Sequence, residues 1–261
     1  MTITDQIGRQ TIKSVRHFLD LFAFAARMGR LLLQRHGYGH AMVYRSTVKQ
    51  VYFTAILALP VVCFIALIVG SIVIVQSVTY QNLTGGGFLL SDLIVILIVR
   101  ELGPLFVAII VVLRSGVAVT IEAGYMTVFK EMDLLQTMGI DPVHLIGIPR
   151  LLGITTATLC LFWVFDVTAI FGGYLVALAA TDMPLEHLLS GIGKSISISD
   201  IFVPIIKALF FGIIIATNCL YRGFGVRHSI IEIPAVCSRA AVESLLYCLF
   251  VDIVISTMFY I

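Results

Sequence analysis

Charged residues are scarce in this chain of 261 residues: 12% are charged, whereas 59% are hydrophobic. None occurs between Gln50 and Ser91. The mean hydropathy is +1.05, and a water-soluble domain of this length needs far more polar surface. The apolar runs are continuous rather than alternating with polar residues, which favours helices over strands. We therefore expect an all-α integral membrane protein.

Sequence motifs of soluble enzymes and metal proteins are also missing. The "GIGKS" at 191–195 resembles the end of a P-loop, but Leu188 stands where the first glycine belongs. His36 and His40 flank glycines and have no third ligand nearby. The first forty residues lack the apolar core of a signal peptide, so we expect no cleavage there. The cysteines show no CxxC or Cys/His spacing and are interpreted as small hydrophobic residues: Cys63, Cys160, Cys219, Cys237 and Cys248.

Five apolar runs are long enough to cross a membrane as helices. Residues 1–49 are predicted to form a cytoplasmic and interfacial region, and residues 50–261 a five-span domain. Of the 17 Lys and Arg residues, eight precede the first span, while the loop at 79–92 has none. Because basic residues in short loops stay in the cytoplasm, the N-terminus is predicted to be cytoplasmic and the C-terminus periplasmic. The predicted spans are 51–78, 93–113, 151–178, 201–221 and 240–261.

Residues 14–36 show the pattern of an amphipathic helix. Phe18 and Phe22 recur at helical spacing, opposite Arg16 and Arg27. This pattern favours a helix in the cytoplasmic membrane interface, with its basic residues near lipid phosphates. An ordinary amphipathic helix packed against protein is the alternative.

Five ionisable residues lie deep inside the predicted spans. At about 1.5 Å per helical residue, they fall within one depth band in the middle to outer half of the membrane. Such residues usually face a bundle interior or a watery cavity. Two interpretations stay open: they face substrate, or they neutralise one another and fix the packing of the helices. We expect Glu101 and Lys207 to pair across helices. The five residues are Arg100, Glu101, Asp166, Lys207 and Asp252.

Gly103 and Pro104 follow two of these charges directly. Pro104 has no N–H to donate to the carbonyl of Arg100, so the helix is expected to kink or open there. At membrane depth, a freed carbonyl is tolerated only where protein or a cavity satisfies it. A local opening beside the charges is the favoured interpretation, and a simple packing kink is the alternative.

Two further patterns occupy the connection after the second span. Gly116, Thr120 and Gly124 recur every four residues and predict close helix packing, within the bundle or between copies. The Met-rich segment 122–142, "EAGYMTVFKEMDLLQTMGIDP", ends at Gly139 and Pro142, as helices do. An exposed Met-rich face suits a mobile docking partner, although the segment could instead fold back onto the bundle.

Three motifs occur in an order that resembles one protein family. They are "RELGP" at 100–104, "RSGVAVTIEAGYM" at 114–126 and "MDLLQTMGIDPVHLIGIPR" at 132–150. The sequence looks like the MlaE/YrbE permeases, the membrane subunits of bacterial ABC lipid transporters that work with MCE proteins. The similarity runs from about residue 50 to the C-terminus.

The resemblance implies a non-enzymatic homodimer in the inner membrane of a Gram-negative bacterium. Expected partners are ABC ATPase subunits that bind ATP and Mg, a hexameric MCE protein and usually a STAS-domain subunit. The cargo would be phospholipid, moved between the inner membrane and the MCE protein; no cofactor on this chain and no nucleic acid are expected. By resemblance, Arg100, Glu101, Lys207 and Arg239 belong to a polar substrate cavity. The implied ATPase-coupling residues are Phe129, Lys130, Glu131, Asp133, Met138, Gly139, Asp141 and Pro142.

Two other functions remain alternatives. An ion- or proton-coupled secondary transporter could use the buried carboxylates as relays. A membrane scaffold would use its charges only to fix packing. No internal repeat of the kind found in many secondary transporters is evident in the sequence.

Overall fold

The computed structural model describes residues 3–33, 40–84, 95–180, 197–226 and 229–260, and every regular element within them is helical. The prediction of an all-α fold is confirmed. The longer helices are α1 (Ile3–Leu33), α2 (His40–Ala55), α3 (Leu59–Thr84), α5 (Gly103–Val111), α6 (Val117–Val128), α7 (Glu131–Thr137), α8 (Ile148–Ala180), α10 (Ile198–Phe224) and α11 (Ile233–Tyr260). Short helical segments join or extend them: η1 (Ile56–Ala58), η2 (Val95–Leu102), η3 (Val112–Gly116), η4 (Val143–Gly147) and η5 (Ile230–Glu232).

Five continuous helical runs are long and apolar enough to cross a membrane, as predicted. Helices extend past the predicted spans because the helical backbone continues beyond the apolar residues. The second run, for example, continues through η3 and α6 to Val128, fifteen residues past the predicted end at 113. The five runs are Ala41–Ser77, Val95–Val128, Val143–Leu175, Ser199–Phe224 and Ile230–Phe259.

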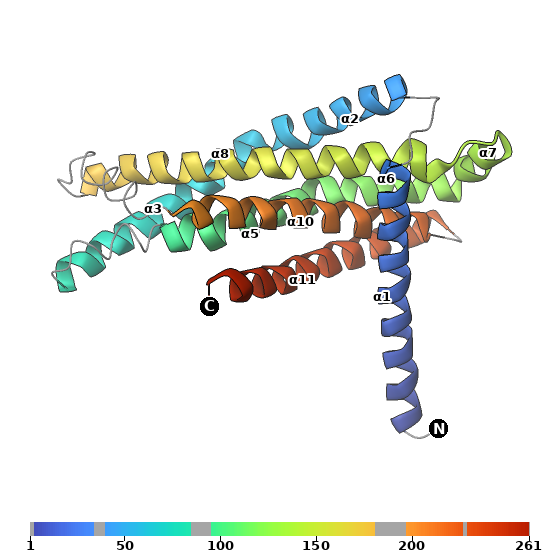
Figure 1. Ribbon diagram of the computed structural model, residues 1–261, viewed down its shortest axis with the longest axis horizontal. Helices are drawn as coiled ribbons and strands as arrows, with labels where there is room; N and C mark the ends of the chain where they lie inside the picture. The colour runs from blue at the N-terminus through green and yellow to red at the C-terminus, as the bar shows by residue number, and fades with distance from the viewer. Residues whose placement is uncertain (1–2, 34–39, 85–94, 181–196, 227–228, 261) are drawn as a thin grey trace.

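The spans lie roughly along one axis, with α1 crossing near one end (Figure 1). The helix α8 packs against α2, α3 and α10, and α10 also packs against α6 and α11. Large apolar side chains fill the space between these helices; Phe162, Phe165 and Phe211 are fully buried or nearly so. The tip formed by α7 lies at the same end as α1, and the C-terminus of α11 points toward the other end (Figure 1). Which end faces the cytoplasm stays a prediction.

The helix α1 packs on the bundle over part of its length, and its position in the membrane interface stays a prediction. Its C-terminal part packs on the bundle, because Met28 is fully buried and Phe24 contacts the rings of Tyr221 and Phe224. Phe22, by contrast, is 70% exposed on the same helix. An apolar stripe therefore remains uncovered, as expected of a helix that also contacts a membrane surface.

The small residues of α6 pack within the chain. Thr120 Oγ1 donates a hydrogen bond to the carbonyl of Cys219 on α10, at 3.2 Å. A Cβ atom on Gly116 would lie 2.9 Å from the Cys219 sulfur, and one on Gly124 would be in ordinary contact with Ile233 of α11. The prediction of close packing is confirmed, and α10 and α11 are the partners.

Two glycines allow α3 and α8 to cross at close range. A Cβ atom on Gly70 would lie 2.0 Å from the carbonyl oxygen of Ala169, and one on Gly173 would lie 2.5 Å from the backbone of Gly70. Backbone opposes backbone at this crossing, so a rotamer change cannot relieve the overlap. The first long span is held against the centre of the bundle by this contact.

Gly70→Ala should therefore destabilise the protein by about 1 to 3 kcal/mol, the usual cost of overpacking a tight core. Gly29→Ala on α1 is the matched control, because a Cβ atom there meets nothing within 4 Å and alanine favours the helix. Thermal unfolding of the detergent-solubilised protein measures both. Equal melting temperatures for the two variants would contradict the close crossing.

Candidate functional site

The side chain of Lys207 lies at the centre of a polar cluster inside the membrane spans. It has no exposed surface, and its ammonium lies 2.8 Å from Asp252 Oδ1 and 3.2 Å from Glu101 Oε1. It donates to Ser256 Oγ at 2.7 Å, and that hydroxyl donates to Glu101 Oε1 at 2.8 Å. Burying an ammonium costs several kcal/mol unless partners surround it. The predicted pairing of Glu101 with Lys207 is observed, and Asp252 and Ser256 complete the cluster.

Pro104 explains one further contact of Lys207. The proline stands in the first turn of α5, directly after the π-helical segment η2, and cannot donate to the carbonyl of Arg100. The Lys207 ammonium donates to that carbonyl instead, at 2.9 Å. The predicted helix irregularity is therefore a π-to-α junction, and its carbonyl is satisfied by protein.

Arg100 points to a different partner. Its guanidinium lies 2.7 Å from Asp200 Oδ1, and the side chain of Asp200 is almost completely buried. The other carboxylate oxygen of Asp200 accepts from the backbone N–H of Ser197 at 2.9 Å, which caps the start of α10. This ion pair connects the η2 segment to the first turn of α10.

The cluster reaches the surface through two side chains. Arg100 is 24% exposed and Glu101 is 34% exposed, whereas Lys207 is fully buried. A ligand could therefore reach part of the Arg100 guanidinium, which pairs with Asp200, and part of the Glu101 carboxylate, with Lys207 buried behind Glu101. Arginine donates well to phosphate oxygens, and a carboxylate accepts from an ammonium. This arrangement suits a polar headgroup that carries a phosphate.

The structure does not join every predicted residue to this cluster. Asp166 on α8 lies against Gly103, where a Cβ atom would come within 2.4 Å of its Oδ1, and it pairs with no cation among the described residues. Gly103 thus makes room for a carboxyl group. Arg239 is exposed on α11, thirteen residues from Asp252, which corresponds to roughly 20 Å along a helix. The placement of Arg239 in the cavity is not supported by this single chain.

Asp200 and Ser256 were missed from the sequence. Asp200 follows Ser197 by three residues, which is the spacing of a capping box, but the ion pair to Arg100 has no local signal. Ser256 lies four residues after Asp252, so the two share a helix face. That spacing could have indicated Ser256 once Asp252 was selected.

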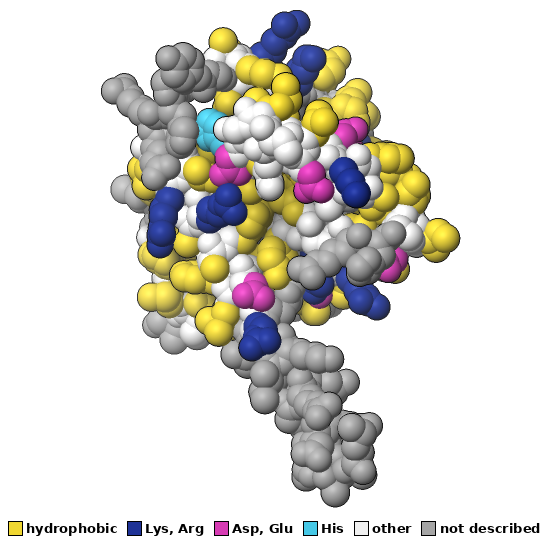
Figure 2. Space-filling model, turned by 90° about the vertical axis from the view of Figure 1, so that its right-hand side faces the viewer, with side chains coloured by type: hydrophobic (Ala, Val, Ile, Leu, Met, Phe, Trp, Pro, Cys, Tyr) yellow, Lys and Arg dark blue, Asp and Glu magenta, His cyan; other side chains and the backbone are white. Residues whose placement is uncertain are grey.

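The segment predicted to couple to an ATPase contains a short helix at the tip of the molecule. The helix α6 ends before Phe129 and Lys130, and Lys130 adopts a positive φ of 58°. The helix α7 begins at the next residue. Most of the predicted residues are exposed, and Leu134 on α7, which was not selected, is 63% exposed. Figure 2 shows charged and hydrophobic side chains mixed over this end of the molecule.

Three predicted members of this segment also have structural roles, and their part in ATPase coupling stays a prediction. Asp141 receives a hydrogen bond from Arg27 of α1 at 3.1 Å and another from the backbone of Val143 at 3.0 Å. Pro142 is buried, and Gly139 has a φ of 77°, which glycine adopts easily. These three residues therefore shape the turn after α7 and hold it near α1. Met132 is also buried, so one face of α7 folds back on the bundle.

Lys207→Met tests how strongly the cluster supports the fold. It would leave Glu101 and Asp252 without a cation and should destabilise the protein by about 3 to 5 kcal/mol, as breaking a buried ion pair does. The triple variant Lys207→Met, Glu101→Gln, Asp252→Asn should recover most of the loss, because no buried charge remains unpaired. Lys130→Met, at an exposed position, is the control. Melting temperatures of the four proteins in detergent measure these effects. A melting temperature of Lys207→Met equal to that of wild type would show that the cluster does not support the fold.

Comparison with known proteins shows which family this chain resembles. The family profile described as "Permease MlaE" matches residues 47–258. A "Probable ABC transporter permease protein" of Rickettsia felis is 26% identical over 264 residues, which cover all of this chain and 98% of the relative. The "Intermembrane phospholipid transport system permease protein MlaE" of Haemophilus influenzae is 24% identical over 97% of this chain and 96% of its own.

A more distant relative comes from a plant. The "Protein TRIGALACTOSYLDIACYLGLYCEROL 1, chloroplastic" of Arabidopsis thaliana is 24% identical over 83% of this chain and 62% of its own. The family profile covers all five helical runs, from within α2 to near the end of α11. The chain therefore belongs to the MlaE permease family.

Proposed function

We propose that this chain is the membrane-spanning permease subunit of an ABC transporter that carries phospholipid between the inner membrane and an MCE protein. ATP is hydrolysed by partner ATPase subunits, and two copies of the permease form the pathway. The proposal agrees with the names of the relatives from Rickettsia felis and Haemophilus influenzae. The observation that carries it is the charged cluster around Lys207, which lies within apolar spans and reaches the surface at Arg100 and Glu101.

A phospholipid meets such a surface with both of its parts. The phosphate accepts hydrogen bonds from Arg100, and an amine on the headgroup donates to Glu101. Exposed apolar side chains of the same segment, Ile96 and Leu97 of η2, provide the surroundings that acyl chains require. In a homodimer, the two exposed pairs would face a shared cavity. Lys207 and Asp252 would hold the pairs in place from behind.

Exposed side chains of α7 and of the residues that flank it form the proposed contact with the ATPase. Phe129, Leu134 and Met138 are 60%, 63% and 67% exposed at the tip of the molecule. Large apolar side chains at such a position are typical of a protein interface. An ATPase that held this tip would move α7 when it binds or releases ATP. The further subunits implied by the resemblance, an MCE hexamer and a STAS-domain protein, would bind elsewhere on the assembly.

Purification of the intact complex separates this function from its alternatives. We expect an ABC ATPase to co-purify, lipid transfer to require ATP, and Glu101→Gln to lower the transfer rate by about tenfold, as loss of one hydrogen bond to a charged group does. A secondary transporter would instead move its substrate without an ATPase and would depend on an ion gradient. A scaffold would tolerate Glu101→Gln without loss. The melting temperature of the variant, compared with wild type, separates lost transport from lost folding.

Leu134→Glu tests the proposed ATPase contact. A buried, unpaired carboxylate in an apolar interface is costly, so this variant should lose most of the co-purifying ATPase and retain its own melting temperature. Gln136→Glu, an exposed position on the same short helix, is the matched control and should retain the ATPase. Equal ATPase yields from the two variants would place the contact elsewhere.

A further inference from the structure

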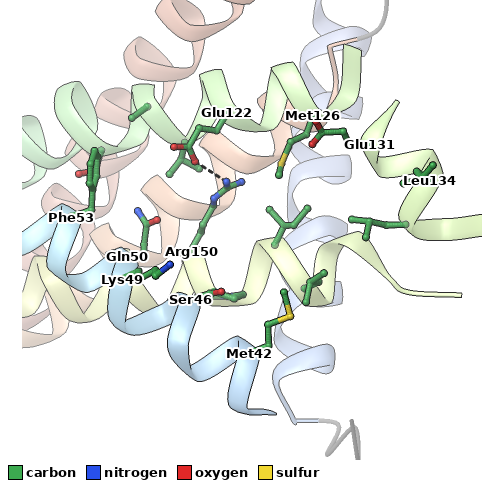
Figure 3. A pocket seen from close by; sticks show the side chains of 17 residues that line it. Met42, Ser46, Lys49, Gln50, Phe53, Glu122, Met126, Glu131, Leu134 and Arg150 are labelled. Carbon is green, nitrogen blue, oxygen red and sulfur yellow. Dashed lines mark hydrogen bonds and ion pairs between the residues drawn. The ribbon is translucent and has the colours of Figure 1, made fainter. Parts of the chain in front are cut away.

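A cavity of about 810 Å³ lies at the α7 end of the bundle, away from the Lys207 cluster. It is enclosed by α2, by η3 and α6, by α7, and by the connection from η4 into α8 (Figure 3). Drug-sized ligands occupy cavities of about 300 to 1,000 Å³. The space therefore admits a lipid headgroup with the first part of its acyl chains.

Two buried polar atoms of residues that line this cavity have no hydrogen-bond partner within the described part of the chain. One is Nη1 of Arg150, whose side chain is 12% exposed and whose Nη2 donates to Glu122 Oε2 at 2.7 Å. The other is Oγ of Ser115, a residue that is 1% exposed. Buried donors are nearly always satisfied in native proteins, so each such exception requires an explanation. A ligand that brings acceptor oxygens into the cavity would satisfy them once the Arg150 guanidinium and the Ser115 hydroxyl turn toward it.

Two side chains of opposite charge also line the cavity, each without an ion-pair partner among the described residues. Neither Lys49 of α2 nor Glu131 of α7 forms an ion pair with another described residue. In Figure 3, Lys49 lies beside Gln50 near Arg150, whereas Glu131 lies on the opposite side, next to Met126. The wall thus offers the unpaired cation Lys49 beside the Arg150–Glu122 ion pair, and the unpaired carboxylate Glu131 in another region. A ligand with a negative and a positive group matches this distribution.

The position along α2 places the cavity at the boundary of the membrane. Lys49 is the last charged residue before the uncharged stretch from Gln50 to Ser91. Phe53, one turn further along α2, also lines the cavity. Lysine side chains commonly lie where a span leaves the hydrocarbon and meets lipid phosphates. The cavity therefore lies at headgroup level, where phospholipid is the abundant ligand.

We infer that this cavity binds the headgroup of one phospholipid that carries an amine. Its phosphate lies against Arg150 and Lys49, and its ammonium lies toward Glu131. The first part of its acyl chains contacts Phe53, on the membrane side of Lys49. This site is separate from the proposed transport pathway, since none of the residues of the Lys207 cluster lines it.

The occupant would contact α7 directly, because Glu131, Leu134 and Leu135 belong to the wall. Lipid bound here would then restrain the helix that docks on the ATPase. This regulatory consequence rests on the proposed function, whereas lipid binding itself does not. The two are tested separately below.

Native mass spectrometry of the purified full-length chain, with the partners that co-purify, measures the binding. The protein is exchanged into micelles that contain phosphatidylethanolamine, phosphatidylglycerol or phosphatidylcholine, and retained lipid is counted. We expect retention of phosphatidylethanolamine above the other two. Lys49→Gln and Glu131→Gln should each weaken retention by about tenfold, the effect of losing one hydrogen bond to a charged group. Arg45→Gln, an exposed position one turn earlier on α2 and outside the cavity, should leave retention unchanged.

The Glu101→Gln background removes the proposed cargo site from the measurement. If retention there still falls with Lys49→Gln, the cavity binds lipid whether or not the transport proposal holds. Ser46→Trp, which fills the cavity, should abolish retention while the melting temperature stays near wild type. Retention unaffected by Lys49→Gln and by Ser46→Trp would overturn the inference. Displacement of the lipid by millimolar inorganic phosphate would assign the site to free phosphate. Loss of the co-purifying ATPase in Ser46→Trp, with lipid retention unchanged, would assign the site to a protein segment. Either result would also overturn the inference.

Discussion

The buried ammonium of Lys207 constrains the rest of this bundle. A lone ammonium is costly in an apolar interior, so the surrounding helices must present oxygen atoms to it. The segment η2 contributes a carbonyl and Glu101, and α11 contributes Asp252 and Ser256. Pro104 fits this requirement, because the residue that removes an N–H donor leaves a carbonyl for Lys207 to bind. Three spans are thus fixed to one another at a single point.

Packing away from this point depends on small residues rather than on charge. In a membrane, apolar side chains gain little by leaving lipid for a protein neighbour, so close contact between backbones becomes important. Gly70 and Gly173 supply it between α3 and α8, and Gly116 supplies it between η3 and α10. The charged cluster selects which helices meet, and the glycines determine how closely they approach.

The sequence predicted the class, the five spans and the pairing of Glu101 with Lys207, because each depends on local composition or on the cost of an isolated charge. It did not predict that Arg100 pairs with Asp200, since both lie on helices whose rotation is set by contacts far apart in the chain. The same limit explains Asp166, which has the expected depth but faces Gly103 rather than a cation. The depth of a residue in the membrane can be counted along the sequence. The direction in which its side chain points around the helix axis is known only once the helices are packed.

One continuous helical run connects the two polar regions of the molecule. From Glu101 in η2 to Glu122 in α6 there are twenty-one residues, or roughly 32 Å of helix. Glu101 contacts the Lys207 ammonium, and Glu122 pairs with Arg150 on the wall of the cavity at the α7 end. The helix α7 follows after a break in the helix at Lys130. A helix is stiff along its axis, so a displacement of the Val128 end of α6 would be transmitted toward Glu101. The π-helical segments η2 and η3 lie at the two ends of α5, and such segments are where a helix most readily changes its register. Movement at the tip would in this way alter the exposure of Arg100 and Glu101.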